Sequence, residues 1–414
     1  MEIIDTTLRE GLQSPLWDDY GKYYPSTEEK VEIFTALVRY GVRYFEVFSP
    51  AISSREKEDL GEIIACKERL TKETKCPIFI FVHSRCHPKD IEEALQFKID
   101  GLNFYIGTSA VSQKFNHSKR LKEIIAAVKP MLSGLRKNYP GLQLRFSGED
   151  AFRTADQELF LIYDKLSDVV DRFGLPDTVG TATPEEVGKR IALFKNRYSQ
   201  IFLEGHFHND RGLALANSLA AIEANIDFVQ TSILGFGERS GITSLTALLF
   251  NLFLQGEKLT GFDLSASYSL NVLLAGVMKM QVPAAEPISL TNRTHSAGVH
   301  TQAVLKNSAV YEGHPWEKFG VTEQRLLLGQ LSGRHIIHYF LTEILNFVGV
   351  TKEMVEELTP EFKKRAAKLP KGETPWRLLE KIAMEYGLAK KEKPATHFEK
   401  LNGDGSVDKR EVDR

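Results

Sequence analysis

Short apolar, β-branched runs alternate with longer segments of helical periodicity through the first two thirds of the chain. The runs recur at intervals of roughly 25 to 45 residues, as in parallel β-α units. The predicted strands are Glu2–Asp5, Tyr44–Val47, Pro77–Phe81, Leu102–Ile106, Leu142–Ser147, Val170–Leu175, Ile201–His206 and Phe228–Ser232. Eight strand–helix units within about 260 residues have the size of a (β/α)8 barrel. We therefore predict an α/β fold, a TIM barrel followed by a mostly helical C-terminal region.

Start signals mark the helices between these strands. Ser26 and Glu29 form the capping-box pattern that opens a helix predicted for 26–40, and Thr183 with Pro184 opens one predicted for 183–197. Beyond the barrel, helices are predicted at 265–280, 335–348, 351–369 and 374–388.

The alternation stops after the eighth strand, which predicts the division into domains. The predicted parts are a catalytic barrel over 1–262, a linker with one helix over 263–287, a helical lid and dimerisation region over 288–388, and a flexible polar tail over 389–414. Within the tail, Asn402-Gly-Asp404-Gly-Ser406 resembles a calcium loop only faintly, because no bidentate Glu follows at the required spacing.

Polar side chains gather at the carboxyl ends of the predicted strands. They include Arg9, Glu10, Glu46, Ser49, His83, Arg85, Arg145, Ser147, Glu149, Asp177, Thr178, His206, His208 and Asp210. Catalytic residues of such barrels lie in the loops that follow the strands. This end of the barrel is therefore the predicted active site.

Composition narrows the class of protein. The 414 residues are 42% hydrophobic and 26% charged, which is typical of a globular protein and not of a disordered or membrane-embedded one. The formal net charge of −2 argues against nucleic acid or an anionic membrane as a partner. The three cysteines form no C-x-x-C pair, no secretory signal is visible, and the most apolar stretch, 245–254, is too short to span a bilayer. We expect a soluble protein of the cytoplasm.

His206-Phe207-His208 is the sharpest local feature. Side chains on a strand alternate, so both imidazoles point to the same side at the barrel mouth. With Glu10 as a third ligand, they form the set expected for a divalent metal that keeps positions open for substrate. The alternative is a pair of hydrogen-bonded structural histidines.

Arg9 precedes the predicted ligand Glu10. A planar guanidinium beside a metal suits a carboxylate or a developing oxyanion. The alternative is a structural salt bridge to Glu46 or Glu149.

Several motifs together resemble one superfamily. They are Asp5-Thr-Thr-Leu-Arg-Glu-Gly11, Ser49-Pro50-Ala51, His83-Ser-Arg-Cys-His87, Arg145-Phe-Ser-Gly-Glu-Asp150, Asp177-Thr-Val-Gly-Thr-Ala-Thr-Pro184, Gly205-His-Phe-His-Asn-Asp210, Gly235-Phe-Gly-Glu-Arg-Ser-Gly241 and Thr294-His-Ser-Ala-Gly-Val-His300. The chain is similar to the DRE-TIM metallolyases, and within them to the acyl-CoA Claisen condensing enzymes of the homocitrate synthase and isopropylmalate synthase type. The resemblance extends to about residue 350.

The resemblance implies roles for the site residues. Glu10, His206 and His208 would bind one divalent metal (Zn, Mg, Mn or Co), which holds a 2-oxo acid. Arg9 would stabilise the alkoxide. Acceptor binding would involve Gln13, Gln113, Arg145, Ser147 and Thr178. Glu149, His300 and Tyr311 would serve deprotonation of acetyl-CoA and the protonation steps. In relatives the last two come from the neighbouring subunit, which implies a homodimer whose C-terminal region covers the partner barrel.

Three glycines follow the eighth strand. Gly235, Gly237 and Gly241 are a candidate CoA loop, because backbone N–H groups after this strand often bind phosphate in such barrels. A simple tight turn explains the same glycines equally well.

The sequence departs from homocitrate synthases at positions that bear on the substrate. Asn103 and Gln113 stand where those enzymes carry an Asp and an Arg, and a neutral amide does not replace a bidentate guanidinium unless Lys114 substitutes for it. Leu12 replaces an acidic residue, and an aromatic insertion follows it through Tyr24, which would either shape the acceptor pocket or pack over the barrel rim. The acceptor, the metal and inhibition by an amino acid are left open.

We predict an acyltransferase of amino-acid biosynthesis. It would condense acetyl-CoA with a 2-oxo acid and then hydrolyse the thioester, in the manner of homocitrate synthase. Within the class, the alternatives are 2-isopropylmalate, citramalate and re-citrate synthases; Ile242 stands where isopropylmalate synthases carry Asn. The alternatives of another kind are a metal-dependent carbon–carbon lyase or aldolase, and a non-catalytic metal-binding protein.

Overall fold

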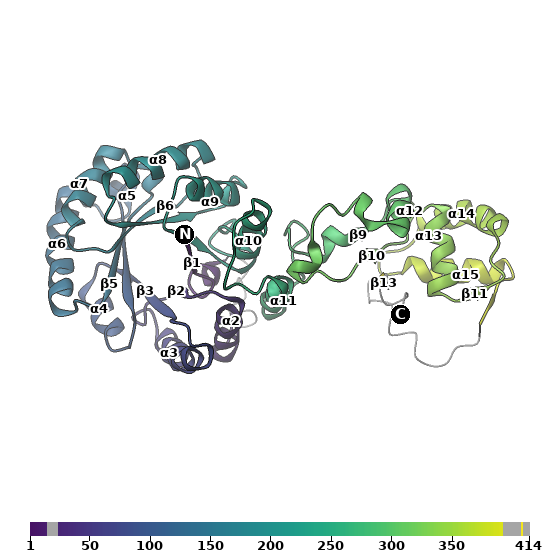
Figure 1. The fold of residues 1–414 in the computed structure, drawn as a ribbon, viewed down its shortest axis with the longest axis horizontal. Helices are drawn as coiled ribbons and strands as arrows, with labels where there is room; N and C mark the ends of the chain where they lie inside the picture. The colour runs from purple at the N-terminus through teal and green to yellow at the C-terminus, as the bar shows by residue number, and fades with distance from the viewer. Residues whose placement is uncertain (15–23, 392–406, 409–414) are drawn as a thin grey trace. The chain divides into compact units, whose positions relative to one another are not determined.

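The computed structural model describes residues 1–14, 24–391 and 407–408. The chain forms two compact units, Met1–Glu286 and Pro287–Arg414 (Figure 1). Most of the insertion after Leu12, and the Asn402–Ser406 segment with its faint calcium pattern, lie outside the described residues.

The first unit is a closed barrel of parallel strands, which confirms the predicted TIM barrel. The strands follow one another around the barrel in chain order, and β1 closes it by pairing with β8. Their bounds are β1 Glu2–Asp5, β2 Tyr44–Val47, β3 Phe79–Arg85, β4 Gly101–Gly107, β5 Gln143–Glu149, β6 Arg172–Asp177, β7 Phe202–Phe207 and β8 Phe228–Thr231.

The third strand extends further than the sequence predicts. It was expected at 77–81 and lies at Phe79–Arg85, where His83 pairs with Asn103 and Arg85 with Tyr105 of β4. Its polar end belongs to the strand because the barrel interior is itself polar at this level. A hydrophobic pattern alone therefore ends the strand too early.

Helices surround the barrel (Figure 1). Their bounds are α2 Thr27–Tyr40, α3 Ser54–Thr74, α4 Pro88–Ala94, α5 Ala110–Phe115, α6 Leu121–Asn138, α7 Asp156–Leu166, α8 Pro184–Arg197, α9 Ala214–Glu223, α10 Leu245–Leu254 and α11 Ser267–Val277. The capping boxes of Ser26 with Glu29 and of Thr183 with Glu186 are both formed. Burying the helices' apolar faces against the outer strand surfaces makes the main hydrophobic core.

The inside of the barrel holds buried charge. Glu46, Arg145, Arg172 and Glu204 are buried, and Arg145 Nη2 lies 2.9 Å from Glu204 Oε1. The Arg172 guanidinium carbon lies 4.1 Å from the centre of the Phe81 ring. Two carboxylates and two guanidiniums offset one another, and this pairing counters the cost of taking them out of water.

A fully buried aspartate, Asp5, ends β1. Burial raises the pKa of Asp5 to about 7, although hydrogen bonds from the Thr7 backbone N–H (2.9 Å) and hydroxyl (3.0 Å) lower it. The folded protein therefore holds this proton up to about pH 7, whereas the unfolded chain releases it near 3.8. Ionisation of Asp5 thus destabilises the fold as the pH rises between these two values.

We predict that Asp5→Asn removes the pH-dependent loss of folding stability that ionisation of Asp5 causes. The stability of the variant relative to the wild type should rise from about pH 4 to about pH 8, by on the order of a few kcal/mol. Urea unfolding of both proteins across this range measures the difference. A difference that does not change with pH would contradict the prediction.

The second unit is mostly helical, with short strands. Its elements are β9 Thr294–His295, α12 Gly298–Lys306, β10 Arg325–Leu326, α13 Arg334–Tyr339, β11 Phe347–Val348, α14 Lys352–Ala366, α15 Pro375–Glu385, β12 Ala389–Lys390 and β13 Val407–Asp408. It has its own apolar core, which includes Ile336, Phe340, Leu358, Phe362 and Leu379.

The helix predicted for 335–348 is too long. α13 continues as a π-helical segment only to Ile344, and Asn346 then takes a left-handed backbone conformation with φ of 54°. Phe347–Val348 pairs instead with Ala389–Lys390, two residues that the sequence places in the polar tail. Because 40 residues separate the two strands, their pairing cannot be predicted from the local pattern of hydrophobic residues.

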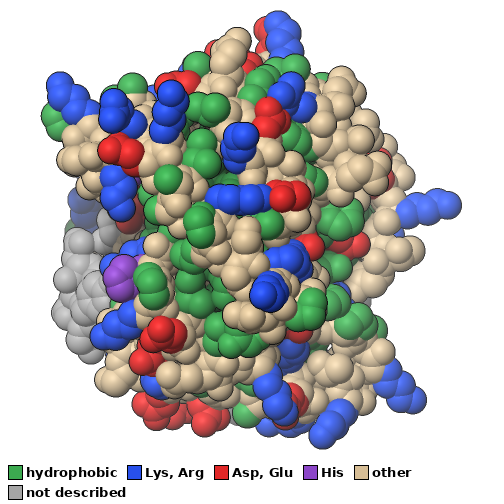
Figure 2. Space-filling model, turned by 90° about the vertical axis from the view of Figure 1, so that its left-hand side faces the viewer, with side chains coloured by type: hydrophobic (Ala, Val, Ile, Leu, Met, Phe, Trp, Pro, Cys, Tyr) green, Lys and Arg blue, Asp and Glu red, His purple; other side chains and the backbone are tan. Residues whose placement is uncertain are grey.

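No helix among the described residues is long and apolar enough to cross a bilayer. On the face that Figure 2 shows, Lys and Arg side chains lie among Asp, Glu and hydrophobic side chains. This mixture differs from the concentrated basic surface that binds a phosphate backbone.

Candidate active site

A cavity of about 670 Å³ lies at the carboxyl end of the barrel strands. The predicted site residues that line it are Arg9, Glu10, Gln13, Arg145, Ser147, Glu149, Thr178, His206 and His208. They come from loops or strand ends that are far apart in the sequence, and barrel closure brings them together. Its lining also includes His83, one of the polar strand-end residues predicted from the sequence, and Tyr105 and Gln230, which no sequence pattern singles out.

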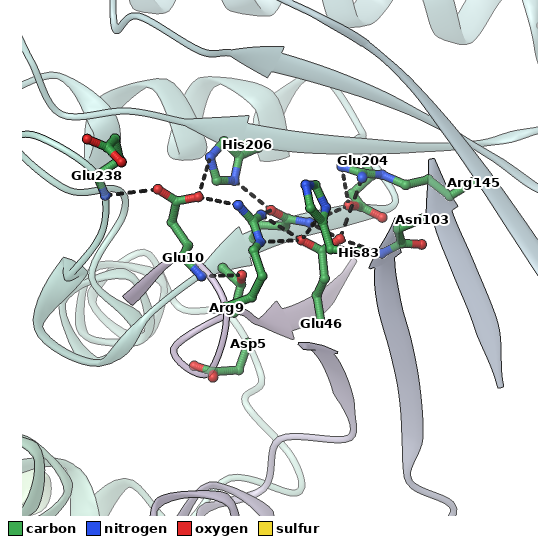
Figure 3. Close-up of polar contacts among 12 residues, drawn as sticks. Asp5, Arg9, Glu10, Glu46, His83, Asn103, Arg145, Glu204, His206 and Glu238 are labelled. Atoms are coloured by element: carbon green, nitrogen blue, oxygen red, sulfur yellow. Dashed lines mark hydrogen bonds and ion pairs between the residues drawn. The ribbon is translucent and has the colours of Figure 1, made fainter. Parts of the chain in front are cut away.

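Glu10, His206 and His208 form a buried cluster whose candidate ligand atoms all lie within 4.8 Å of one another. His206 Nε2 lies 3.0 Å from His208 Nε2 and 3.9 Å from Glu10 Oε2 (Figure 3), and His208 Nε2 lies 3.8 Å from Glu10 Oε1. β7 carries His206, and Glu10 follows β1.

The protonation states of this cluster fit a metal. Burial, with the neighbouring His208, lowers the pKa of His206 to about 3, and burial also lowers the pKa of His208. Although burial raises the pKa of Glu10, the Arg9 charge and the two histidines bring it down to about 2. Two neutral imidazoles and one carboxylate are a donor set for a divalent transition metal with open positions.

The glycine loop after β8 packs against this cluster. A Cβ at Gly237 would lie 2.9 Å from Glu10 Cγ, and one at Gly241, where φ is 81°, would lie 2.0 Å from the Gly235 carbonyl oxygen. The Glu238 backbone N–H donates to Glu10 Oε1 at 2.9 Å. The glycines therefore meet the steric demands of a tight turn that holds Glu10, and CoA binding by this loop stays a prediction.

Arg9 contacts both carboxylates beside it. Its Nη1 donates to Glu10 Oε2, and its Nε donates to Glu46 Oε1 at 2.8 Å (Figure 3). The salt bridge to Glu46 that the sequence allowed as an alternative is thus present. Arg9 also lines the cavity, so the salt bridge fixes a guanidinium where an oxyanion would form.

Arg145 and Ser147 of β5 present unused polar atoms. Arg145 Nε and Ser147 Oγ are buried and have no hydrogen-bond partner among the described residues. Both residues line the cavity, and a carboxylate of a bound acceptor can satisfy both atoms. Gly174 of β6 makes room for them, since a Cβ there would lie 1.9 Å from Ser147 Oγ and 2.9 Å from Arg145 Nε.

We predict that Gly174→Ala weakens acceptor binding. The added methyl must displace the Ser147 hydroxyl, which costs about one hydrogen bond and raises the KM for the acceptor about tenfold. Metal content should not change. Gly188→Ala on α8 is the matched control, because the nearest atom to its Cβ is 3.8 Å away. Equal KM values for the two variants would contradict the prediction.

Glu149 ends β5 at the cavity wall. Burial raises the pKa of Glu149, and the charge of Asp150 raises it further. A carboxylate with a raised pKa is the stronger base, as general-base catalysis near neutral pH requires.

Gln113 and Asn103 take structural positions. The Gln113 side-chain amide donates to the Thr108 carbonyl at 2.8 Å, and Gln113 is not part of the cavity lining. Lys114, the possible substitute cation, is exposed and lies over the Phe115 ring. Asn103 is buried and donates to Glu46 Oε2 at 2.5 Å.

His300 and Tyr311 lie together in the second unit. Their ring centroids are 4.2 Å apart, and both residues are exposed. Glu312 anchors the segment behind them, since it accepts hydrogen bonds from Arg293 Nε (3.0 Å) and Gln324 Nε2 (2.6 Å). His300 and Tyr311, which the resemblance names together, thus form a pair in the structure.

Comparison with known proteins identifies the family of both units. Residues 1–274 match the HMGL-like family model, and residues 290–370 match the model for the homocitrate synthase post-HMGL domain-like family. The mitochondrial homocitrate synthase of Schizosaccharomyces pombe is 36% identical over 368 residues, covering 88% of this chain and 84% of the relative. The cytosolic homocitrate synthase isozyme of Saccharomyces cerevisiae is 32% identical, covering 88% and 81%. The 2-isopropylmalate synthase of Methanocaldococcus jannaschii is 31% identical, covering 87% and 67%.

Solved structures agree on the fold. The hydroxymethylglutaryl-CoA lyase of Pseudomonas aeruginosa superposes with a TM-score of 0.55 at 20% identity, covering 68% of this chain and 94% of that one. Together, the barrel and the matches over both units show that the chain belongs to the HMGL-like family, in the branch that carries the homocitrate synthase post-HMGL domain.

Proposed function

We propose that this chain is an acetyl-CoA condensing enzyme of the homocitrate synthase type. It joins acetyl-CoA to a 2-oxo acid and hydrolyses the thioester that results. The observation that carries the proposal is the Glu10, His206 and His208 cluster beside Arg9 in the cavity. The match of residues 290–370 to the homocitrate synthase domain favours condensation over the lyase reaction of the structural neighbours.

Different residues of the site carry out the separate steps of the condensation. Glu10, His206 and His208 would hold a divalent metal, which when bound polarises the acceptor ketone as a Lewis acid. Arg9 places its fixed positive charge where the ketone oxygen becomes an alkoxide. Glu149 removes a proton from the acetyl methyl group.

A second set of cavity residues orients the 2-oxo acid acceptor. Arg145 Nε and Ser147 Oγ bind a carboxylate of the acceptor, since both atoms otherwise lack a partner among the described residues. Thr178 adds its hydroxyl at the same wall of the cavity, where its oxygen accepts from the Asp150 N–H at 2.9 Å. Gln13, an exposed lining residue, reaches the acceptor from the loop after β1.

The comparisons favour a dicarboxylate acceptor. The relatives at 36% and 32% identity are named homocitrate synthases. Homocitrate has three carboxylates, and the hydrolysed acetyl group supplies one of them, so the acceptor of those enzymes supplies two. We therefore favour an acceptor such as 2-oxoglutarate for this chain, in which Gln113 is not a cation.

A thiol-release assay tests the function. Purified protein is mixed with acetyl-CoA and each of 2-oxoglutarate, oxaloacetate, pyruvate and 2-oxoisovalerate, with and without a chelator. We expect release of CoA with a dicarboxylate and loss of release with chelator. No release with any acceptor would refute condensation, and release mainly with 2-oxoisovalerate would favour isopropylmalate synthesis.

The identity of the metal and the cellular compartment are tested separately. The metal is to be identified by elemental analysis of the purified protein. We propose the cytoplasm as the compartment, which the cytosolic yeast isozyme supports, although mitochondrial relatives exist as well. Cell fractionation decides between them.

We further propose a homodimer in which His300 and Tyr311 complete the partner's site. Apolar side chains surround this pair and are exposed, with Val299 at 72%, Leu331 at 63% and Val310 at 59%. Such a surface is typical of an interface.

Subunit complementation tests the shared site. Glu149→Gln and His300→Ala should each be inactive alone, and unfolding and refolding them together should restore about a quarter of wild-type activity, because mixed dimers of a symmetric pair hold one intact site. If His300 served the barrel of its own chain, the mixture would stay inactive.

A further inference from the structure

A glutamine without an assigned role, Gln230, touches the predicted metal site. It lies on β8, is fully buried and lines the cavity. Its Oε1 accepts from His206 Nδ1 at 2.5 Å and from Arg9 Nη2 at 3.2 Å. Its Nε2 donates to Glu204 Oε1 at 2.7 Å and to Glu46 Oε2 at 3.2 Å.

These contacts allow only one orientation of the Gln230 amide. In the opposite orientation the NH2 group would face the Arg9 guanidinium, and the amide oxygen would face the carboxylates of Glu46 and Glu204. Both arrangements are repulsive and leave buried groups without partners. The network therefore fixes an acceptor, Oε1, opposite His206 Nδ1.

The fixed acceptor determines the tautomer of His206. Because Gln230 Oε1 can only accept, His206 Nδ1 must carry the proton, and the Nε2 lone pair then faces Glu10 and His208. A neutral imidazole carries one ring proton, so Nε2 is left free to bind metal.

We propose that Gln230 is a positioning residue that presets His206 for metal binding and links the metal site to Arg9 and to the buried charges of the barrel. This inference rests on the proposed metal site. It concerns the tautomer and orientation of one imidazole, and both are measurable without turnover.

His208 offers an internal contrast. Its Nδ1 is buried and has no hydrogen-bond partner among the described residues, and its Nε2 lies 3.0 Å from His206 Nε2. Since His206 Nε2 carries no proton, the metal-free protein satisfies this contact with a proton on His208 Nε2. We therefore expect the two histidines to hold opposite tautomers before metal binds.

Nitrogen-15 NMR of the histidine rings in full-length, metal-free protein tests this directly. The two signals are assigned by comparison with His206→Gln and His208→Gln. We expect His206 as the Nδ1–H tautomer and His208 as the Nε2–H tautomer. An Nε2–H tautomer at His206 in the wild type would overturn the proposal, and this outcome requires no Gln230 variant to fold.

Two variants separate the accepting oxygen of the Gln230 amide from its donating NH2 group, the two halves of the amide. Gln230→Met keeps the approximate size and loses both halves, so we expect His206 to lose its tautomer preference and Zn²⁺ affinity to fall about 10- to 100-fold by titration calorimetry. Gln230→Glu keeps an acceptor for His206, and its second oxygen can face the Glu46 and Glu204 carboxylates only when it carries a proton. In this neutral form the variant should retain the Nδ1–H tautomer of His206, with affinity within about tenfold of the wild type. Unchanged affinity and tautomer in Gln230→Met would overturn the proposal.

Gln324→Met is the matched control. Gln324 is also a buried glutamine that donates to a glutamate, but it belongs to the second unit, so its loss should leave Zn²⁺ affinity unchanged. The proposed function fails separately, in the case where wild-type protein binds metal as described but releases no CoA with any acceptor.

Discussion

His208→Ala is expected to abolish tight metal binding and to lower the rate of CoA release by at least about 10³-fold, because the lost Lewis acid supplies several kcal/mol of transition-state stabilisation. In the variant only two of the three ligands, Glu10 and His206, remain, which is too few to hold a divalent ion tightly. Elemental analysis and a thiol-release assay measure the two effects.

The control for this prediction is His335→Ala. His335 is an exposed histidine of the second unit, so its removal should change neither metal content nor activity. Unchanged metal content in His208→Ala would refute the site assignment itself.

Glu149→Gln is expected to lower kcat/KM for acetyl-CoA by about 10²- to 10⁴-fold, the contribution typical of a general base. The reason is that only the ionised carboxylate of Glu149 can take the proton. Burial and the Asp150 charge raise the pKa of Glu149, so wild-type activity should fall as the pH drops through a value above that of an ordinary Glu. The pH dependence of kcat/KM measures this acid limb.

Asp150→Asn tests the same assignment by shifting the acid limb of the pH profile of kcat/KM. It removes the charge that raises the pKa of Glu149, so the limb should move to lower pH. Asn suits the left-handed conformation of residue 150, where φ is 65°. An acid limb that keeps its position in Asp150→Asn, or that persists in Glu149→Gln, would show that another group acts as the base.

The sequence predicted the barrel because strand and helix periodicities are local properties, and each of the eight strands recurs near its predicted position. Glu10, His206 and His208 were also predictable, since their chemistry stands out at strand ends. Gln230 was not. One glutamine in an apolar run carries no signal of its own, and its meaning comes from partners on β2 and β7 that only barrel closure brings to it.

The second unit shows the same limit. The resemblance named His300 and Tyr311. The ion pair of Glu312 with Arg293, which holds the segment next to Tyr311, joins residues 19 positions apart and is buried, so it could not be predicted from local sequence. The strand at Phe347–Val348 depends likewise on a distant partner.

The charged interior of the barrel constrains how this enzyme can change by mutation. Glu46 alone contacts Arg9, Asn103, Arg145 and Gln230. Replacing any one of these residues leaves an uncompensated charge or a buried polar group without its partner. A change of this network by one substitution at a time therefore produces destabilised variants along the way. New acceptor preferences should therefore arise first at the cavity rim, at residues such as Phe48 and Ile52, where apolar side chains can be exchanged one at a time. Directed evolution that randomises the rim and leaves the floor intact should yield more folded variants than the reverse.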